Sequence, residues 1–251
     1  MGVSRQWCGN LGKEDNCQVG VFLGYSSEKG HTLVDRRLYL PRAWAEDRER
    51  RIQAHIPDIV SFKPSWELAW EMYLDARHRG MPHGWVTGDE EFGKIYALCD
   101  QLHAYGQPYV FEVATNAAVY DEPPRFRKAF KRKRGRAAGK PGVVGGRKPT
   151  TVTKVIEELD ARDWERYRVR DGEKGPLEVE AVRVQIWLSR DLMPSRPAWL
   201  VATRTRGPKP VRKFFLAECS WRTSLKEILR AAFSPWSMGQ CFEQGKQELG
   251  M

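Results

Sequence analysis

A basic segment without acidic residues is the feature that most constrains how this chain can fold. Residues 125–148 contain eleven Lys and Arg side chains and no Asp or Glu, together with the stretch GKPGVVGGRKP. Such a segment lacks the apolar periodicity of a helix or strand, and its like charges repel one another when they are packed together. We therefore predict a flexible basic linker at residues 123–150, with a folded region on each side of it.

The region before the linker has the pattern of a mixed α/β sheet. Leu68, Met72 and Ala76 recur at helical spacing, and Tyr109 begins a β-like run that ends at Val113. The succession of elements is typical of α/β folds. We predict strands at 17–25 and 33–40 that form a hairpin, a short helix or ordered loop after Pro41, a helix from Ser65 to about Gly80, a strand at 85–87, a helix at 92–106 and a strand at 109–113.

The region after the linker alternates apolar and polar residues. Segments 179–187, 198–203 and 213–216 have the period of strands, and Pro- and Gly-bearing turns separate them. They predict an antiparallel β unit. Ser224 then caps a helix that is interrupted at Ser234-Pro235. The predicted domains are 1–122 (N-terminal core), 123–150 (linker), 151–220 (β-rich insertion domain) and 221–251 (C-terminal helical part of the core).

Composition narrows the possible partners and the compartment. The 251 residues carry a net charge of +10, which favours polyanions such as nucleic acid or an anionic membrane surface. No run approaches the length of a membrane span, and the first residues lack a signal-peptide pattern, so we expect a cytoplasmic protein without a membrane partner. The five cysteines form no CxxC pair, and we expect reduced, mostly buried thiols.

Asp89 is the candidate for chemistry. It follows a short apolar strand and precedes Glu90-Glu91-Phe92-Gly93, a position that projects a carboxylate from the C-terminal edge of a sheet. The competing interpretation is that Asp89 only caps the helix that follows it. Local sequence leaves both interpretations open.

Several motifs resemble those of insertion-sequence DDE transposases. They include Asp15-Asn16-Cys17-Gln18-Val19 and Asp35-Arg36-Arg37-Leu38-Tyr39-Leu40-Pro41. Val86-Thr87-Gly88-Asp89-Glu90-Glu91-Phe92-Gly93 is similar to the segment that bears the second catalytic Asp of that family. Residues 240–250, QCFEQGKQELG, resemble its C-terminal signature. The resemblance implies a ribonuclease H-like mixed sheet with an antiparallel β insertion domain.

The resemblance also implies a reaction. Three carboxylates would hold two divalent ions, Mg²⁺ by family expectation, which promote DNA cleavage and strand transfer during transposition. Asp89 would be one catalytic residue and metal ligand. The first Asp should lie on a strand before Cys8. Since the chain begins only a few residues earlier, we expect that Asp and its strand to be missing, and the sheet to be incomplete.

The third carboxylate is also expected to be missing. The family pattern places a Glu seven positions before a Lys, and counting back from Lys246 reaches Gly239. Pro235 occupies the place of the family's Arg. Because relatives continue beyond Gly250, we expect a truncated, catalytically impaired fragment, or alternatively a non-catalytic DNA-binding or regulatory remnant. Glu243 lies a helical turn from Gly239, a displacement of about 5–6 Å that a metal site does not tolerate. Asp15 and Asp35 are not expected to substitute either.

The implied partner is DNA, in the form of transposon ends and target DNA. Cations in a mobile loop would contact phosphates without base specificity. The residues assigned to this role are Arg125, Arg127, Lys128, Lys131, Arg132, Lys133, Arg134, Arg136, Lys140 and Lys246. We also expect a homo-oligomer or a hetero-oligomer with an intact transposase, and association with the nucleoid. We interpret Trp66, Trp70, Trp187 and Trp199 as core residues, not as platforms for base stacking.

Overall fold

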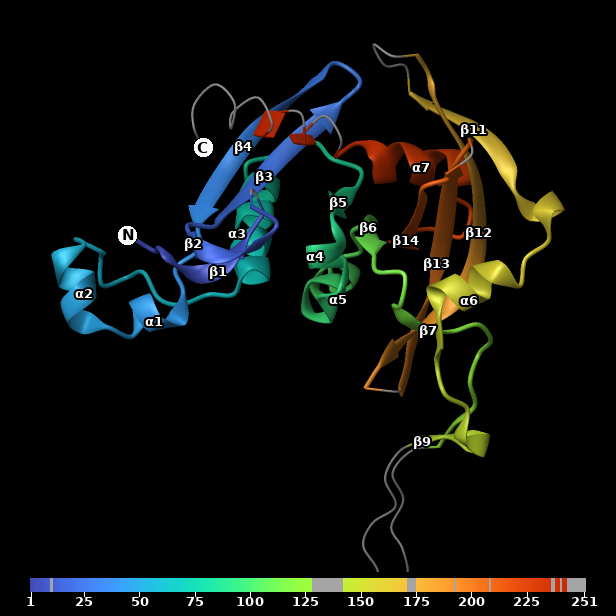
Figure 1. Cartoon of the computed structure of the whole chain (residues 1–251), viewed down its shortest axis with the longest axis horizontal. Helices are drawn as coiled ribbons and strands as arrows, with labels where there is room; N and C mark the ends of the chain where they lie inside the picture. Colours follow the sequence, from blue (N-terminus) through green and yellow to red (C-terminus); the bar gives the residue numbers. More distant parts are fainter. Residues whose placement is uncertain are drawn as a thin grey trace, which may run out of the picture. The chain divides into compact units, whose positions relative to one another are not determined.

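The computed structural model describes residues 1–9, 11–127, 142–170, 175–191, 193–207, 209–235, 238–239 and 241–242. The chain divides into two compact units (Figure 1). Unit 1 comprises Met1–His83 and Ser234–Met251, and unit 2 comprises Gly84–Phe233. None of the helices in the described ranges is long and apolar enough to cross a membrane.

In its described residues, unit 1 contains two hairpins and the helices α1, α2 and α3. Strands β1 (Ser4–Cys8) and β2 (Lys13–Cys17) pair in one hairpin, and β3 (Gly20–Ser27) and β4 (Gly30–Leu38) pair in the other. The β3–β4 hairpin confirms the predicted strand pair. The short helices α1 (Arg42–Ala45) and α2 (Arg48–Gln53) follow Pro41, and α3 (Ser65–His78) confirms the predicted amphipathic helix.

A small cluster holds the first helices in place. Leu40, Trp44 and Ile56 are buried together, and the indole Nε1 of Trp44 donates to the carbonyl oxygen of Val3 at 2.7 Å. The guanidinium of Arg50 lies 3.8 Å from the centre of the Trp44 ring. These contacts order a charged stretch that the sequence pattern alone did not assign to one conformation.

Unit 2 is built on one mixed sheet. Its strands lie in the order β10-β7-β12-β13-β14-β6-β5, with β11 also paired to β12. Only the β5–β6 pair is parallel among these ladders. The strands are β5 (Val86–Gly88), β6 (Tyr109–Val113), β7 (Ala118–Tyr120), β10 (Thr150–Thr151), β11 (Glu165–Arg170), β12 (Leu177–Arg190), β13 (Met193–Thr205) and β14 (Arg212–Glu218). The predicted mixed α/β class is confirmed, and the three predicted strands of the β unit are found as β12, β13 and β14.

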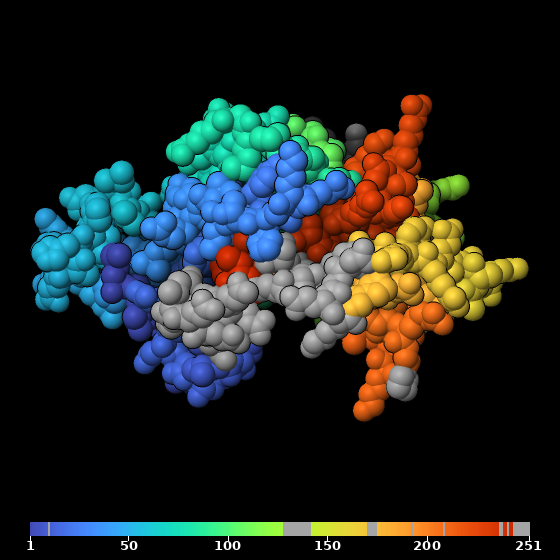
Figure 2. All heavy atoms as spheres, turned by 90° about the horizontal axis from the view of Figure 1, so that it is seen from above, coloured from blue at the N-terminus to red at the C-terminus, as the bar shows by residue number. Residues whose placement is uncertain are grey.

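The period of two along these strands gives the sheet two apolar faces. Helix α6 (Val152–Glu157) packs on the face that carries Ile186 and Leu200. Helix α7 (Leu225–Phe233) packs on the other face, against Val201 and Phe215. Figure 2 shows the β12–β13 end, in orange, and the β13–β14 end, in darker orange, projecting from this unit. The assignment of residues 151–220 to a separate insertion domain stays a prediction.

The predicted helix at 92–106 is wrong as a single element. The structure has α4 (Glu90–Gly93) and α5 (Tyr96–Ala104). They are separated because Ile95 is extended, with φ −96° and ψ 92°. The apolar spacing continues across this break, so periodicity could not reveal it.

Four further short elements lie between β7 and β11 in the chain. Strands β8 (Phe126–Arg127) and β9 (Gly142–Val143) pair antiparallel, and a 3₁₀ turn, η1 (Val144–Gly146), follows β9. A second 3₁₀ turn, η2 (Ala161–Asp163), precedes β11. Thus the ends of the basic segment are brought together by a pair of strands.

Helix α7 begins with a reciprocal cap, as predicted for Ser224. The Ser224 hydroxyl accepts from the Glu227 backbone N–H at 3.2 Å, and Glu227 Oε2 accepts from the Ser224 backbone N–H at 2.9 Å. The bonds from the backbone and the side chain of Ser224 lower the pKa of Glu227 below its ordinary value of 4.5. The cap therefore requires the ionised carboxylate.

We expect the contribution of this cap to depend on pH. Because the folded-state pKa of Glu227 is lowered, its stabilisation is present at neutral pH and is lost as the pH falls below the ordinary carboxyl range. Glu227→Gln should be less stable than wild type at neutral pH, and the difference in urea midpoint should close in acid. Glu178→Gln, at an exposed position on β12, is the control and should show no such convergence. A difference that stays constant with pH would contradict the assignment.

Candidate active site

Asp89 lies where the sequence placed it, after the last residue of β5. The register of the parallel pair matches Gly88 with Phe111 of β6, so Asp89 leaves the C-terminal edge of this pair. Its Oδ1 accepts from the backbone N–H groups of Glu91 at 3.0 Å and Phe92 at 3.4 Å. Asp89 is therefore the N-cap of α4, as the competing interpretation held.

Capping does not use the whole Asp89 carboxylate. The residue is exposed, and no hydrogen bond to its Oδ2 and no ion pair is formed by any side chain in the described ranges. A cap fixes one oxygen and thereby orients the other. The role of Asp89 as a metal ligand stays a prediction, and its capping role is compatible with it.

The nearest acidic residue along the neighbouring strand is already paired. Glu112 follows Phe111 in β6, and its carboxylate accepts from Lys213 Nζ at 2.8 and 3.0 Å. Lys213 lies on β14 and is 43% exposed, so this pair is partly screened by solvent. The negative charge of Glu112 is thus compensated by Lys213 on another strand of the sheet.

The carboxylates of Asp15 and Asp35, in unit 1, also have ion-pair and hydrogen-bond partners. Asp15 lies 3.2 Å from Lys13 Nζ and accepts from the Asn16 backbone N–H. Asp35 accepts from Arg37 Nη1 at 2.5 Å and from the Arg36 backbone N–H at 2.7 Å. Both carboxylates therefore have internal partners, and the expectation that they do not substitute for a missing catalytic acid stays a prediction.

Gly239 belongs to unit 1 and is exposed. The segment around it packs on β3. The rings of Phe22 and Phe242 meet edge to face at 5.1 Å, and a Cβ at Gly24 would lie 2.8 Å from Met238 Sδ. A Cβ at Gly239 would meet no heavy atom within 4 Å. Among the described residues, the position that should carry the third carboxylate therefore accommodates a Cβ atom. Glu243 and Lys246 lie outside the described residues.

The described residues do not provide a formed metal site. They contain no group of three or more His, Cys, Asp or Glu side chains placed to hold an ion. A two-metal centre needs several carboxylates on one pair of ions. Asp89 supplies one such group, so the expected pair of magnesium ions does not fit the described residues as they stand.

The basic segment contains the two paired strands β8 and β9. Arg127 of β8 pairs with Gly142 of β9, and the Val144 backbone N–H donates to the carbonyl oxygen of Arg125 at 2.8 Å. Figure 1 shows β9 at the end of an arm that extends away from the sheet beyond β7. The other predicted DNA contacts lie outside the described residues, namely Lys128, Lys131, Arg132, Lys133, Arg134, Arg136 and Lys140.

Arg147, near the end of the basic segment, has two acidic partners. Arg147 forms ion pairs with Asp121 Oδ1 at 2.7 Å and Glu122 Oε2 at 2.5 Å, which raise the pKa of its guanidinium. These acids come just before the acid-free stretch in sequence. Because both acids pair with Arg147, its charge is largely compensated within the protein.

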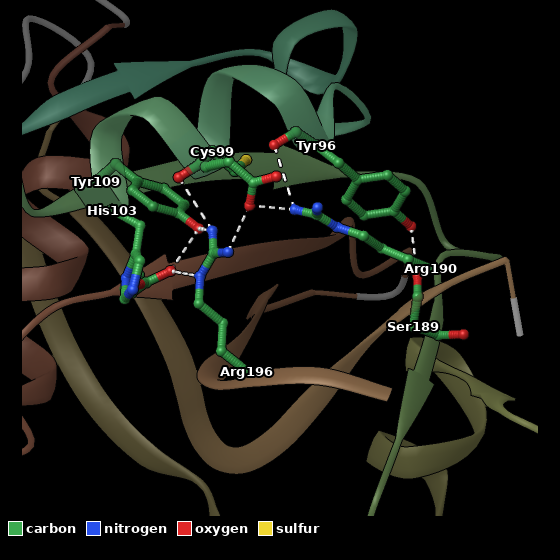
Figure 3. A network of polar contacts seen from close by, with 9 residues as sticks. Tyr96, Cys99, His103, Tyr109, Ser189, Arg190 and Arg196 are labelled. Atoms are coloured by element: carbon green, nitrogen blue, oxygen red, sulfur yellow. Dashed lines mark hydrogen bonds and ion pairs between the residues drawn. The ribbon is translucent and has the colours of Figure 1, made fainter. Parts of the chain in front are cut away.

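A polar network that the sequence did not indicate links α5 to the sheet (Figure 3). Arg196 on β13 donates to Asp100 on α5 and to Glu218 at the end of β14, both at 2.5 Å. It also donates to the carbonyl oxygen of Cys99 at 3.0 Å, and the Tyr109 hydroxyl donates to Glu218 at 2.8 Å. Since Tyr109 begins β6, the network lies at the end of the β5–β6 pair opposite to Asp89.

The network extends to the surface on both sides. His103 contacts Glu218, and Arg190 contacts Asp100 while its guanidinium lies 5.0 Å from the centre of the Tyr96 ring. Burial would raise the pKa of Asp100, but its bonds to Arg190 and Arg196 lower it overall. Burial raises the pKa of the Cys99 thiol to about 11, so this thiol is neutral. The network joins α5 to β13 and β14 through paired charges and hydrogen bonds.

Two expectations about side-chain burial need correction. Cys99 is buried, but the other four cysteines are half-buried, so the prediction of mostly buried thiols is wrong. The four tryptophans predicted as core residues are half-buried rather than fully buried, and Trp199 packs against the cluster that contains Phe215. Trp199 meets Trp221 edge to face at 4.9 Å, and the Arg183 guanidinium lies 4.5 Å from its ring centre.

Comparison with known proteins identifies the family. A family model described as a DDE superfamily endonuclease matches residues 1–176. The chain belongs to this family, and the resemblance drawn from its motifs is confirmed. The match includes Asp89 and the basic segment, and it ends before Gly239. No curated protein was found to match the chain.

Proposed function

We propose that this protein acts in the DNA-mediated transposition of an insertion sequence and that its own DNA-cleaving site is impaired. The observation that carries the proposal is the family match across Asp89, whose exposed carboxylate leaves the edge of the parallel β5–β6 pair. Enzymes of this family are generally dependent on divalent metal ions and act on DNA. Asp89 is the residue that we propose as a metal ligand.

The impairment is inferred from the third carboxylate position. Counting from Lys246 places Gly239 where the family resemblance calls for Glu. Glycine has no group that can bind a metal ion or activate water. Since Asp15, Asp35 and Glu112 all have cationic partners, the described residues offer no evident replacement. Cleavage would require carboxylates that this set of residues does not supply.

A nicking assay tests both statements. The purified chain is incubated with supercoiled plasmid and Mg²⁺ or Mn²⁺, and conversion to the open-circular form is compared with that of Asp89→Asn. We expect no nicking that depends on Asp89. Nicking that is abolished by Asp89→Asn would overturn the proposed impairment. A Cβ at Gly239 meets no described atom within 4 Å, and a gain of Asp89-dependent nicking in Gly239→Glu would locate the defect at this position.

A second candidate function is regulatory. Residues 128–141 carry seven Lys and Arg and no acidic residue, which favours DNA binding without a requirement for catalysis. In this case the protein would pair with an intact transposase, or with another copy of itself, and occupy its DNA. Adding the purified chain to an active transposase of the same family would then inhibit strand transfer. Asp89→Asn should inhibit equally well.

A further inference from the structure

Two glycines stand near Asp89 in the sequence, one before it and one after it. Gly88 ends β5, and Gly93 ends α4. Neither has a positive φ, so backbone conformation does not explain the choice of glycine. Their surroundings do, because each faces an atom that an added methyl group would meet closely.

Gly93 lies directly on the backbone of β6. A Cβ at this position would lie 2.0 Å from the carbonyl oxygen of Glu112 and 3.2 Å from Val113 Cγ1. The obstructing oxygen belongs to a strand that is paired on both of its edges, with β5 and β14. Rotation of a side chain cannot relieve that overlap, so a residue with a Cβ would force α4 away from the sheet.

A displacement of α4 would reach Asp89 directly. The Gly93 backbone N–H donates to the carbonyl oxygen of Asp89 at 3.0 Å, and the N–H groups of Glu91 and Phe92 hold its Oδ1. The helix has only four residues, so it has no second turn in which to absorb a shift. The position of the Asp89 carboxylate therefore depends on the position of α4. The position of α4 in turn depends on its contact with the Glu112 carbonyl oxygen.

Gly88 makes a milder contact of the same kind. A Cβ there would lie 3.0 Å from the ring of Phe111 and 3.2 Å from Phe92 Cβ. These are side-chain atoms, which can move by a few tenths of an ångström. A substitution at Gly88 should therefore disturb Asp89 less than one at Gly93.

From these contacts we propose that Gly93 is a positioning residue for Asp89, with Gly88 as its weaker counterpart. The functional part of this proposal rests on the proposed role of Asp89 in DNA cleavage, but the positioning itself does not. Close packing of α4 on the Glu112 carbonyl sets the direction in which the Asp89 carboxylate leaves the edge of the sheet.

The test uses glycine-to-alanine variants of the full chain and two spectroscopic readouts. Hydrogen exchange is followed at the Glu91 and Phe92 amides, and the side-chain carboxyl carbon of Asp89 is followed by NMR after assignment with Asp89→Asn. Gly93→Ala should speed exchange of both amides by about tenfold or more and should shift the Asp89 resonance. Protection of the β13 amides should remain.

Gly84→Ala is the matched control, because a Cβ at Gly84 meets no atom within 4 Å and the change should leave both readouts unaltered. Wild-type exchange and an unshifted Asp89 resonance in a folded Gly93→Ala chain would overturn the proposal. If Gly93→Ala does not fold, Gly88→Ala must show the same changes at smaller size, and an unchanged Gly88→Ala would then overturn it. A chain that never cleaves DNA can still pass this test, so failure of the proposed function is distinguishable from failure of the positioning.

Discussion

Replacing seven cations of the basic segment by serine should lower the affinity of the protein for DNA by about 10³-fold at low salt. The positions are Lys128, Lys131, Arg132, Lys133, Arg134, Arg136 and Lys140. Each phosphate contact releases counterions, so log Kd changes with log salt with a slope of about 0.9 per contact. If all seven side chains touch phosphates, the variant should lose about six units of that slope. Fluorescence anisotropy with a labelled duplex at several salt concentrations measures both quantities.

A charge-matched variant distinguishes the effect of the basic segment on DNA affinity from the effect of the protein's net charge. Seven exposed cations elsewhere are replaced by serine, which leaves the same formal charge of +3, from +10 minus seven. The positions are Lys13, Lys29, Arg42, Arg48, Lys94, Arg162 and Lys209. This variant should keep most of the affinity. Equal losses of affinity in the two variants would show that DNA binding depends on the overall charge. The basic segment would then not be a specific part of the DNA-binding surface.

Replacing Arg196 by methionine should cost about 3 kcal/mol in the free energy of unfolding. Arg196 is 17% exposed and bonds to both Asp100 and Glu218, and removal of one partner from a buried ion pair leaves an uncompensated charge. Glu218 keeps Tyr109 and Asp100 keeps Arg190, so we expect the lower end of the usual range. Urea denaturation followed by circular dichroism gives the value.

The loss should shrink as the solution becomes acidic. The pKa of Asp100 is lowered in the folded protein, so its stabilising interaction is lost as the pH falls below the ordinary carboxyl value of 3.8. Arg162→Met is the control, because Arg162 is 85% exposed and its pair with Asp160 should contribute well under 1 kcal/mol. Similar losses in the two variants would show that the network is no more important than a surface ion pair.

Elements with a clear apolar pattern were predictable from the sequence. The run from Tyr109 to Val113 is β6, and the alternating segments after the linker are β12, β13 and β14. Ser224 caps α7 through a bond to the residue three positions on, which is local information. In each case the residues that determine the element lie within the element or next to it.

Features that depend on distant partners were not predictable. Strand β2 has the sequence KEDNC, which is poor in strand-forming residues, and it is extended because it pairs with β1. The break at Ile95 follows α4, whose last residue lies on the carbonyl of Glu112. Arg196 joins acids that lie 96 positions before it and 22 after it in sequence, and only the strand register brings them together.

Asp89 shows how far local reasoning reaches at the candidate site. The sequence left open whether this residue caps a helix or serves chemistry, and the structure shows the cap. It also shows that the hydrogen bonds from the described residues reach only Oδ1, which a pattern of residue types does not reveal. The partners of Asp15, Asp35 and Glu112 are likewise visible only in three dimensions.

The division of the chain has a consequence for how the protein is made. Unit 2 is one continuous stretch, Gly84–Phe233, whereas unit 1 combines Met1–His83 with Ser234–Met251. During synthesis, domains fold as their residues leave the ribosome. Unit 2 can complete its sheet while unit 1 still lacks Phe242, the partner of Phe22. The β3–β4 hairpin therefore gains the contact of Phe22 with Phe242 only after unit 2 has been translated.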